Sequence, residues 1–176
     1  MIAKRTNIES CWHIVPSVFY DFRGEYVETW NKIEYSVYLP DGIDFVQDDF
    51  SMSDRYTLRG FHGDPKTWKI VQAQVGRIQL CLIDMREVSP TYGMNADFII
   101  SETNRHQVLV PAGVAVAHLC LSERCIFDYK QSEYYSRDVQ FSYHYSSNGT
   151  IWPIPERNFI LSNRDRTAPV WERKQS

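Results

Sequence analysis

The sequence predicts an all-β protein, and three observations support this class. Aromatic residues make up 14% of the 176 residues, with eleven Tyr and nine Phe. Short runs of β-branched and aromatic residues recur between turn signals, as is typical of strands. Several such strands at even spacing favour a sandwich or a barrel. The length fits one domain with a sizeable core, and no repeat or linker interrupts it, so we expect a single domain over residues 1–176.

Seven segments have the composition of strands. They are 11–20, 68–75, 77–84, 97–100, 106–111, 114–121 and 125–130. Gly76 separates two of them, as a tight turn requires. Only two short segments look helical: residues 34–39 and the polar C-terminal tail.

Alternation along two of these strands indicates a pocket wall. Alternate residues of a strand share a face. His118 then shares a face with Val116, and Tyr129 shares one with Phe127. An imidazole and a phenol among apolar groups are the general composition of a ligand pocket.

Charge and cysteine usage narrow the class further. The net charge is −3 and the pI is about 5.9, so nothing suggests a nucleic-acid partner. No stretch approaches the roughly 20 apolar residues of a membrane span, and the N-terminus lacks the apolar core of a signal peptide. None of the four cysteines forms a Cys-x-x-Cys pair, and we expect reduced core thiols. These features predict a soluble, cytoplasmic protein without a nucleic-acid or membrane partner.

Residues 58–71 carry the densest concentration of reactive side chains. Arg59, His62 and Lys69 lie within this segment, which glycines and a proline interrupt. It is too charged for a buried strand and too broken for a helix, so it predicts two strand ends meeting around a bend. Histidine, with an unperturbed pKa of about 6.5, suits proton abstraction near neutrality. The alternative is a hydrogen-bonded structural histidine.

Asp165 is a candidate partner for that imidazole. It lies in the turn at 161–169 near the C-terminus and could orient His62, as a carboxylate orients the histidine of a catalytic triad. The alternative is a solvated turn residue. For Asp84 and Arg86, similarly, we expect an ion pair within a turn and no catalytic role. Two of the three tyrosines in 128–135 favour the surface or the rim.

A metal site is not expected. The sequence lacks a His-x-His pair followed by a carboxylate, and His62 is the single histidine of its strand. A catalytic zinc or iron site needs three converging ligands. We therefore expect neither metal nor cofactor.

The motifs together resemble the dTDP-4-dehydrorhamnose 3,5-epimerases, which are cofactor-free cupin enzymes of deoxysugar biosynthesis. The matching segments follow the family order from about residue 12 to 170: 21–28, 47–53, 58–62, 68–71, 84–93, 110–113, 128–135, 151–153 and 161–165. The combination of Leu-Arg-Gly-x-His, Lys-Ile-Val and Asp-x-Arg-x-x-Ser-Pro-Thr is specific. The resemblance implies a cupin-type jelly-roll barrel with few short helices.

The resemblance also implies a role for particular residues. His62 matches the general base, Asp165 its orienting carboxylate, Lys69 the lysine at the C4 oxygen, and Tyr129 the tyrosine that protonates the opposite sugar face. Four residues match positions used for nucleotide and diphosphate contacts: Arg23, Gln47, Arg59 and Tyr135. Arg23 is often given to a neighbouring subunit, because these enzymes are usually homodimers that exchange N-terminal strands.

Three departures from the family pattern leave alternatives open. Val116 stands where the family has a histidine, and His118, two residues on, could substitute in substrate binding. Leu80 replaces a pocket aspartate, and residues 144–149 replace an acidic segment. In addition, 62–69 is similar to a branch that acts on GDP-linked 4-keto-6-deoxy-heptoses.

The expected function is inversion of C3 and C5 of a nucleotide-diphosphate-linked 4-keto-6-deoxy sugar through an enolate. One alternative is a C3-only epimerase or ketoisomerase acting on a GDP- or dTDP-linked 4-keto sugar or heptose. The other alternative is a non-catalytic barrel that binds a sugar nucleotide.

Overall fold

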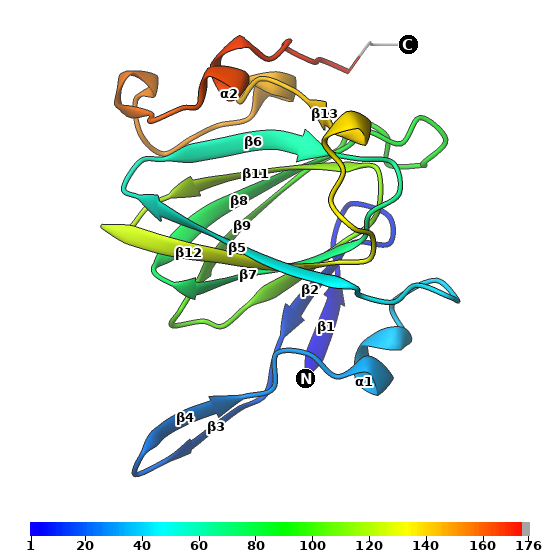
Figure 1. The fold of residues 1–176 in the computed structure, drawn as a ribbon, viewed down its shortest axis with the longest axis vertical. Helices are drawn as coiled ribbons and strands as arrows, with labels where there is room; N and C mark the ends of the chain where they lie inside the picture. The colour runs from blue at the N-terminus through cyan, green and yellow to red at the C-terminus, as the bar shows by residue number, and fades with distance from the viewer. Residues whose placement is uncertain (174–176) are drawn as a thin grey trace.

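Two antiparallel β-sheets face each other and enclose the core in the computed structural model, which describes residues 1–173 (Figure 1). The first sheet has the order β1 (Ile2–Arg5), β2 (Trp12–Val15), β10 (Gln107–Val110), β7 (Lys69–Val75), β12 (Arg124–Gln131) and β5 (Gln47–Asp54). The second has the order β13 (Phe141–Ser142), β6 (Leu58–Gly63), β11 (Val114–Cys120), β8 (Arg77–Asp84) and β9 (Asn95–Ser101). This arrangement confirms the predicted all-β, cupin-type jelly roll.

Helices are few and short, as expected. They are α1 (Lys32–Ser36), α2 (Asn163–Thr167) and the 3₁₀ turns η1 (Arg137–Val139), η2 (Ser147–Gly149) and η3 (Glu156–Asn158). Helix α1 begins two residues before the predicted segment because the Asn31 side chain caps it, accepting hydrogen bonds from two backbone N–H groups. Ser162 caps α2, the helix found in the C-terminal tail; residues 174–176 of that tail lie outside the described residues.

Each of the seven predicted strand segments contains a strand, and the first segment differs from the prediction. The run 11–20 is two strands, β2 and β3 (Val18–Asp21), because Pro16 interrupts the pairing. Strand β3 turns into β4 (Gly24–Val27), and the resulting hairpin projects away from the barrel (Figure 1). The charged segment 58–71 does contain a strand on each side of a bend, β6 and β7. Gly76 makes the tight turn between β7 and β8 with a positive φ of 75°.

The main core lies between the two sheets and confirms the predicted alternation. Cys120, Phe127 and the half-buried Val116 and Tyr129 pack in this cluster, whereas Ala117 packs on the other face of β11. Each fully buried aliphatic side chain contributes about 1.5–3 kcal/mol to the stability of such a core. The core thus holds rigid the strands that line the cavity described below.

The cysteines and helices bear on two further expectations. All four cysteines are buried free thiols, as predicted. No helix in residues 1–173 is long and apolar enough to cross a membrane.

Candidate active site

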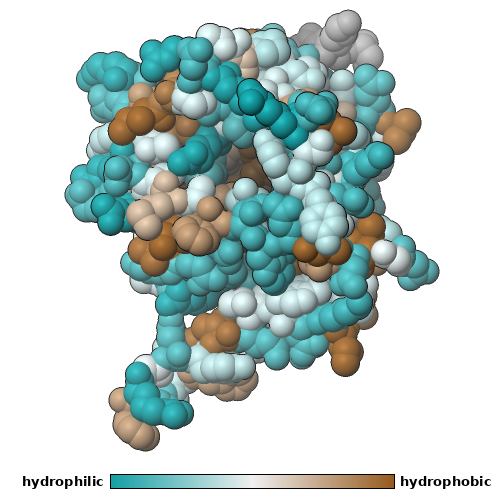
Figure 2. Space-filling model, viewed as in Figure 1, coloured by the Kyte–Doolittle hydropathy of each residue, from teal (hydrophilic) through white to brown (hydrophobic). Residues whose placement is uncertain are grey.

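A cavity of about 640 Å³ opens between the two sheets. The space-filling view shows the molecule hollowed at this place (Figure 2). Strands β5, β7 and β12 form one wall, and β6 and β11 form the other. Helix α2 and the segment after β12 complete the rim. Of the nine residues predicted to act in catalysis or binding, eight line this cavity: Gln47, Arg59, His62, Lys69, His118, Tyr129, Tyr135 and Asp165.

A β-bulge places Arg59 and His62 in the same cavity. Residues three apart in a regular strand point to opposite faces. In β6, however, Arg59 lies opposite His118 and His62 lies opposite Val116, so three steps of β6 face two steps of β11. The extra residue restores the alternation. Gly60, inside the bulge, has a φ of 113°, and a Cβ there would lie 2.7 Å from Cα of Ala117. Glycine is therefore required for this approach of the two strands.

His62 and Asp165 form a close pair. Nε2 of His62 lies 2.6 Å from Oδ1 of Asp165, while the imidazole side chain remains 29% exposed to the cavity. The Oγ of Ser162 donates to Oδ2 of Asp165 at 2.8 Å and accepts from its backbone N–H at 3.1 Å. The interpretation of Asp165 as a solvated turn residue is therefore wrong: the side chain is buried against the histidine.

The carboxylate of Asp165 is held in its anionic form. Burial alone raises its pKa, but the hydrogen bonds from His62 and Ser162 outweigh burial, and the net pKa is lowered. A buried anion bonded to Nε2 fixes the orientation of the ring and the position of its proton. The other ring nitrogen, Nδ1, is then the atom left for a proton transfer.

Lys69 and Tyr129 complete the reactive groups of the cavity. Lys69 begins β7, and burial lowers the pKa of its ammonium group, against the opposing charge of Asp64. Tyr129 lies directly across from Asp49 on β5 and Val71 on β7. Burial first, and the Asp49 carboxylate second, raise the pKa of its phenol, so this group stays protonated well above neutral pH.

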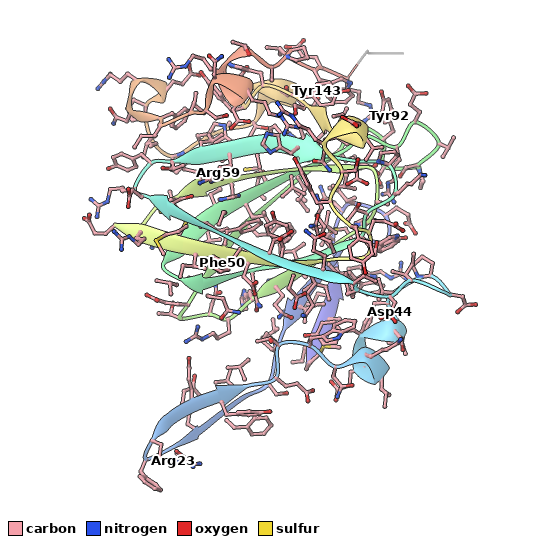
Figure 3. The ribbon with its side chains drawn as sticks, in the orientation of Figure 1. Arg23, Asp44, Phe50, Arg59, Tyr92 and Tyr143 are labelled. Carbon is pink, nitrogen blue, oxygen red and sulfur yellow. The ribbon has the colours of Figure 1, made fainter. Side chains whose placement is uncertain are left out.

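Arg59 and Gln47 are positioned by hydrogen bonds to their neighbours. Arg59 extends from β6 (Figure 3) and lines the cavity. It donates from Nε to Oγ of Ser53 at 3.0 Å and from Nη2 to the carbonyl of Met52 at 3.2 Å. Gln47 accepts from the backbone N–H of Tyr135 at 2.9 Å. The guanidinium group keeps further donors that can bind an anion, because the two bonds use only part of its five-donor fork.

Arg23 is not brought to the cavity within this chain. It lies at the tip of the β3–β4 hairpin, distant from the barrel (Figure 3). Its guanidinium group pairs with Asp21 at 2.6 Å, and its side chain is 76% exposed.

Sequence reasoning missed several residues of the cavity, of which Asp49 and Arg164 are charged. Oδ2 of Asp49 accepts from Nε2 of Gln47 at 2.6 Å and of Gln131 at 2.7 Å. Arg164 donates from Nε to Oγ of Ser142 at 2.8 Å. Asp49 could have been predicted from strand alternation, because it lies two residues after Gln47 on β5 and shares its face. The signal for Arg164 was its place beside Asp165.

The remaining predictions from the sequence concern an ion pair in a turn, the exposure of two tyrosines and metal binding. Asp84 and Arg86 do form a turn pair, with Nε 2.8 Å from Oδ1. Tyr134 and Tyr135 are exposed, as expected for two of the three tyrosines. Within residues 1–173, no group of three or more His, Cys, Asp or Glu residues is placed to hold a metal ion.

A cupin-type barrel whose cavity brings together His62, Asp165, Lys69 and Tyr129 defines the general class of the protein, an enzyme equipped for proton transfer. The family model described as dTDP-4-dehydrorhamnose 3,5-epimerase matches residues 5–173, and the chain belongs to this family.

Individual relatives agree with the family match. The chain is 33% identical to dTDP-4-dehydrorhamnose 3,5-epimerase of Salmonella typhimurium, covering 97% of this chain and 95% of the relative. A solved structure from Legionella pneumophila, in complex with dTDP-4-keto-L-rhamnose, is 30% identical with a TM-score of 0.90 and covers 99% of both chains. A solved structure of a 3'-monoepimerase from Streptomyces bikiniensis, in complex with dTDP-quinovose, is 26% identical in sequence and has a TM-score of 0.86. The match covers 93% of this chain and 84% of the monoepimerase chain.

Proposed function

We propose that this single-domain enzyme inverts C3 and C5 of a nucleotide-diphosphate-linked 4-keto-6-deoxy sugar without a cofactor. The observation that carries the proposal is the His62–Asp165 pair, which lines the same cavity as Lys69 and Tyr129. The activity for which the family and the relatives above are named gives independent support.

The reaction requires removal of a weakly acidic proton next to the C4 ketone. His62, oriented by Asp165, is the proposed base, and a base of this kind contributes about 10²–10⁴ in rate. Lys69 stabilises the negative charge that develops on the C4 oxygen, a contribution of about 10²–10³ per donor. Tyr129 donates a proton to the opposite face of the enolate, which inverts the carbon.

In this proposal the nucleotide diphosphate is held by a cationic, an amide and a phenol side chain. We assign this role to Arg59, Gln47 and Tyr135, and we assign contact with the sugar to His118. The remaining donors of the Arg59 guanidinium suit the paired oxygens of a diphosphate. In this proposal the sugar lies between His62 and Tyr129.

A second subunit completes the site in this proposal. The β3–β4 hairpin projects from the barrel and carries exposed aromatic residues, including Phe19 and Tyr26. In a homodimer that exchanges these N-terminal strands, Arg23 of one protomer reaches the cavity of the other. The four buried free thiols agree with a reducing compartment, and we place the enzyme in the cytoplasm.

One observation favours a second candidate function, epimerisation at one carbon only. Val116, directly opposite His62 on β11, provides no polar group, and the chain also resembles the 3'-monoepimerase. The nucleotide is either dTDP or GDP in both candidates, and the sugar is a hexose or a heptose.

Deuterium incorporation from D₂O distinguishes these candidates. Incubation with the 4-keto sugar nucleotide should introduce deuterium at both C3 and C5, as read by mass spectrometry and NMR. A single exchanged carbon supports the one-carbon epimerase instead. Absence of exchange with either the dTDP- or the GDP-linked ketosugar supports a non-catalytic barrel. His62→Ala is the control: it should abolish exchange while leaving nucleotide affinity within a few-fold.

A further inference from the structure

Two polar atoms in the wall of the cavity are buried without a hydrogen-bond partner among residues 1–173. They are Nε2 of His118 and Oγ of Ser51, and both residues line the cavity. His118 is only 4% exposed. Buried polar groups are nearly always hydrogen-bonded, because an unmade bond costs folding free energy. Two such atoms in one cavity therefore indicate a ligand that supplies the missing partners.

The two groups border the same apolar ring. The imidazole of His118 stacks on Phe127, with the ring centroids 4.1 Å apart and an interplanar angle of 22°. Ser51 lies directly across from Phe127 in the pairing of β5 with β12. Stacking on Phe127 thus fixes the plane of the imidazole, and the strand pairing makes Ser51 the direct cross-strand neighbour of Phe127. Phe127 itself belongs to the hydrophobic core between the sheets.

The chemistry of the cluster selects a neutral partner. Burial, together with the nearby Arg59 guanidinium, lowers the pKa of His118 to about 3, so the ring provides one N–H donor and one acceptor but no charge. The serine hydroxyl likewise donates and accepts. Arg59, opposite His118 in the strand pairing, is the cationic group of this wall and takes the anionic part of the ligand.

We propose that His118 and Ser51 form a subsite for a neutral hydroxyl group of the sugar, and that they select the sugar rather than take part in proton transfer. This inference rests on the proposed function. His118 lies two residues beyond Val116, the residue opposite His62, which corresponds to about 7 Å along the strand. The bound hydroxyl is therefore set apart from the reacting carbons.

Paired ligands test the subsite, because they differ only by the sugar. Calorimetry measures the affinity for each member of two ligand pairs: dTDP with dTDP-quinovose, and GDP with GDP-mannose. The measurements compare the wild type with three variants: Ser51→Ala, His118→Phe and His118→Gln. We expect the wild type to bind one nucleotide sugar more tightly than its diphosphate. Ser51→Ala and His118→Phe should each lower the affinity for that nucleotide sugar by about 3- to 10-fold. Neither variant should change the affinity for the corresponding nucleoside diphosphate. His118→Gln, which keeps a donor, should recover part of the loss.

A structural role would give a different result. Because the two atoms make no bond in the protein, their removal should leave the unfolding temperature within about 2 °C of the wild type. Ser101→Ala is the matched control: this buried serine bonds Thr103 and Asn104 away from the cavity, so its loss should lower the unfolding temperature and change neither affinity.

The subsite proposal is overturned if the wild type prefers neither nucleotide sugar, or if the variants weaken sugar and diphosphate equally or not at all. The D₂O exchange of the wild type separates this failure from failure of the proposed function. If the wild type exchanges deuterium but the variants bind the nucleotide sugar as tightly as the wild type, the subsite alone is rejected. Absence of exchange rejects the catalytic function, while the binding comparison still decides the subsite.

Discussion

Nε2 of His62 and Oδ1 of Asp165 lie 2.6 Å apart, although 103 positions separate the two residues in the chain. The pair joins strand β6 to helix α2, and Ser162 supports the carboxylate from the other side. The carboxylate therefore has one orientation, and through it the imidazole has one orientation as well.

Asp165→Asn should lower the turnover number by about 10²- to 10⁴-fold. An amide can hold the ring in place but does not stabilise the imidazolium that forms when His62 takes the proton. The rate of D₂O exchange measures this effect directly. Ser162→Ala, which removes only the support of the carboxylate, should have a much smaller effect. Equal rates for Asp165→Asn and the wild type would show that the pair is structural.

The same substitution predicts a pH dependence of stability. Because the folded pKa of Asp165 is lowered, its stabilising contribution is complete above the unfolded value of about 3.9 and is lost as the pH falls through the folded value. The difference in free energy of unfolding between wild type and Asp165→Asn should thus be constant from pH 7 to about pH 5 and should decrease below about pH 4. Urea titrations at these pH values measure it.

Lys69→Met should affect activity and stability in opposite directions. Loss of the ammonium group removes the stabilisation of the enolate oxygen, which lowers the turnover number by about 10²- to 10³-fold. Burial lowers the pKa of Lys69, so folding acts against its charged form, and the variant should be more stable than the wild type at pH 7.

The pH dependence of the higher stability of Lys69→Met provides the control for this prediction. The destabilisation by Lys69 is complete below its folded pKa and disappears as the pH rises to the unfolded value of about 10.4. The stability difference between variant and wild type should therefore decrease from pH 7 towards pH 10.5. Lys66→Met, on the exposed bend before β7, should change neither activity nor this difference. A less stable Lys69→Met variant would contradict the assignment.

Tyr129→Phe separates the two faces of the enolate. The raised pKa keeps the phenol protonated, so its loss removes the proton donor but leaves His62 in place. We expect turnover to decrease by about 10²- to 10⁴-fold, while the substrate carbon facing His62 still exchanges deuterium without inversion. Tyr134→Phe, at an exposed tyrosine that does not line the cavity, should behave as the wild type. Loss of exchange together with turnover would mean that Tyr129 is not confined to the second proton transfer.

Local alternation predicted the part of the site that lies on regular strands. The positions of His118 and Tyr129 on the cavity wall follow from a period of two, because β11 keeps its register with β8 and β12 keeps its register with β5. The same rule extends to Asp49 and Ser51, which it could have identified next to Gln47.

Sequence patterns could not predict the contacts that depend on topology or irregular backbone. The approach of Asp165 to His62 requires α2 to return over β6, and no local pattern encodes that return. Residue chemistry made Asp165 a candidate partner, and the family resemblance was needed to favour the pair over a solvated turn residue. Arg59 and His62 share the cavity only because β6 has a bulge, whereas the alternation rule alone would separate them. The position of Arg23 on a hairpin outside the barrel (Figure 3) depends, in the same way, on how the chain leaves β2.

The bulge at Gly60 gives the last prediction. A side chain there would contact the backbone of Val116 and Ala117 at less than van der Waals distance, and the φ of 113° is strained for any other residue. Gly60→Ala should therefore destabilise the fold by about 2–5 kcal/mol, as the sum of backbone strain and overpacking. It should also displace His62 and Arg59, so residual activity falls further than the folded fraction. Gly42→Ala is the matched control, since Gly42 also has a positive φ, 83°, but a Cβ there meets no atom within 4 Å; it should cost only the strain, about 1 kcal/mol, and leave activity unchanged. Circular dichroism during urea unfolding and the D₂O exchange rate measure the two effects, and similar stabilities for the two variants would show that β6 and β11 can separate at the bulge without cost.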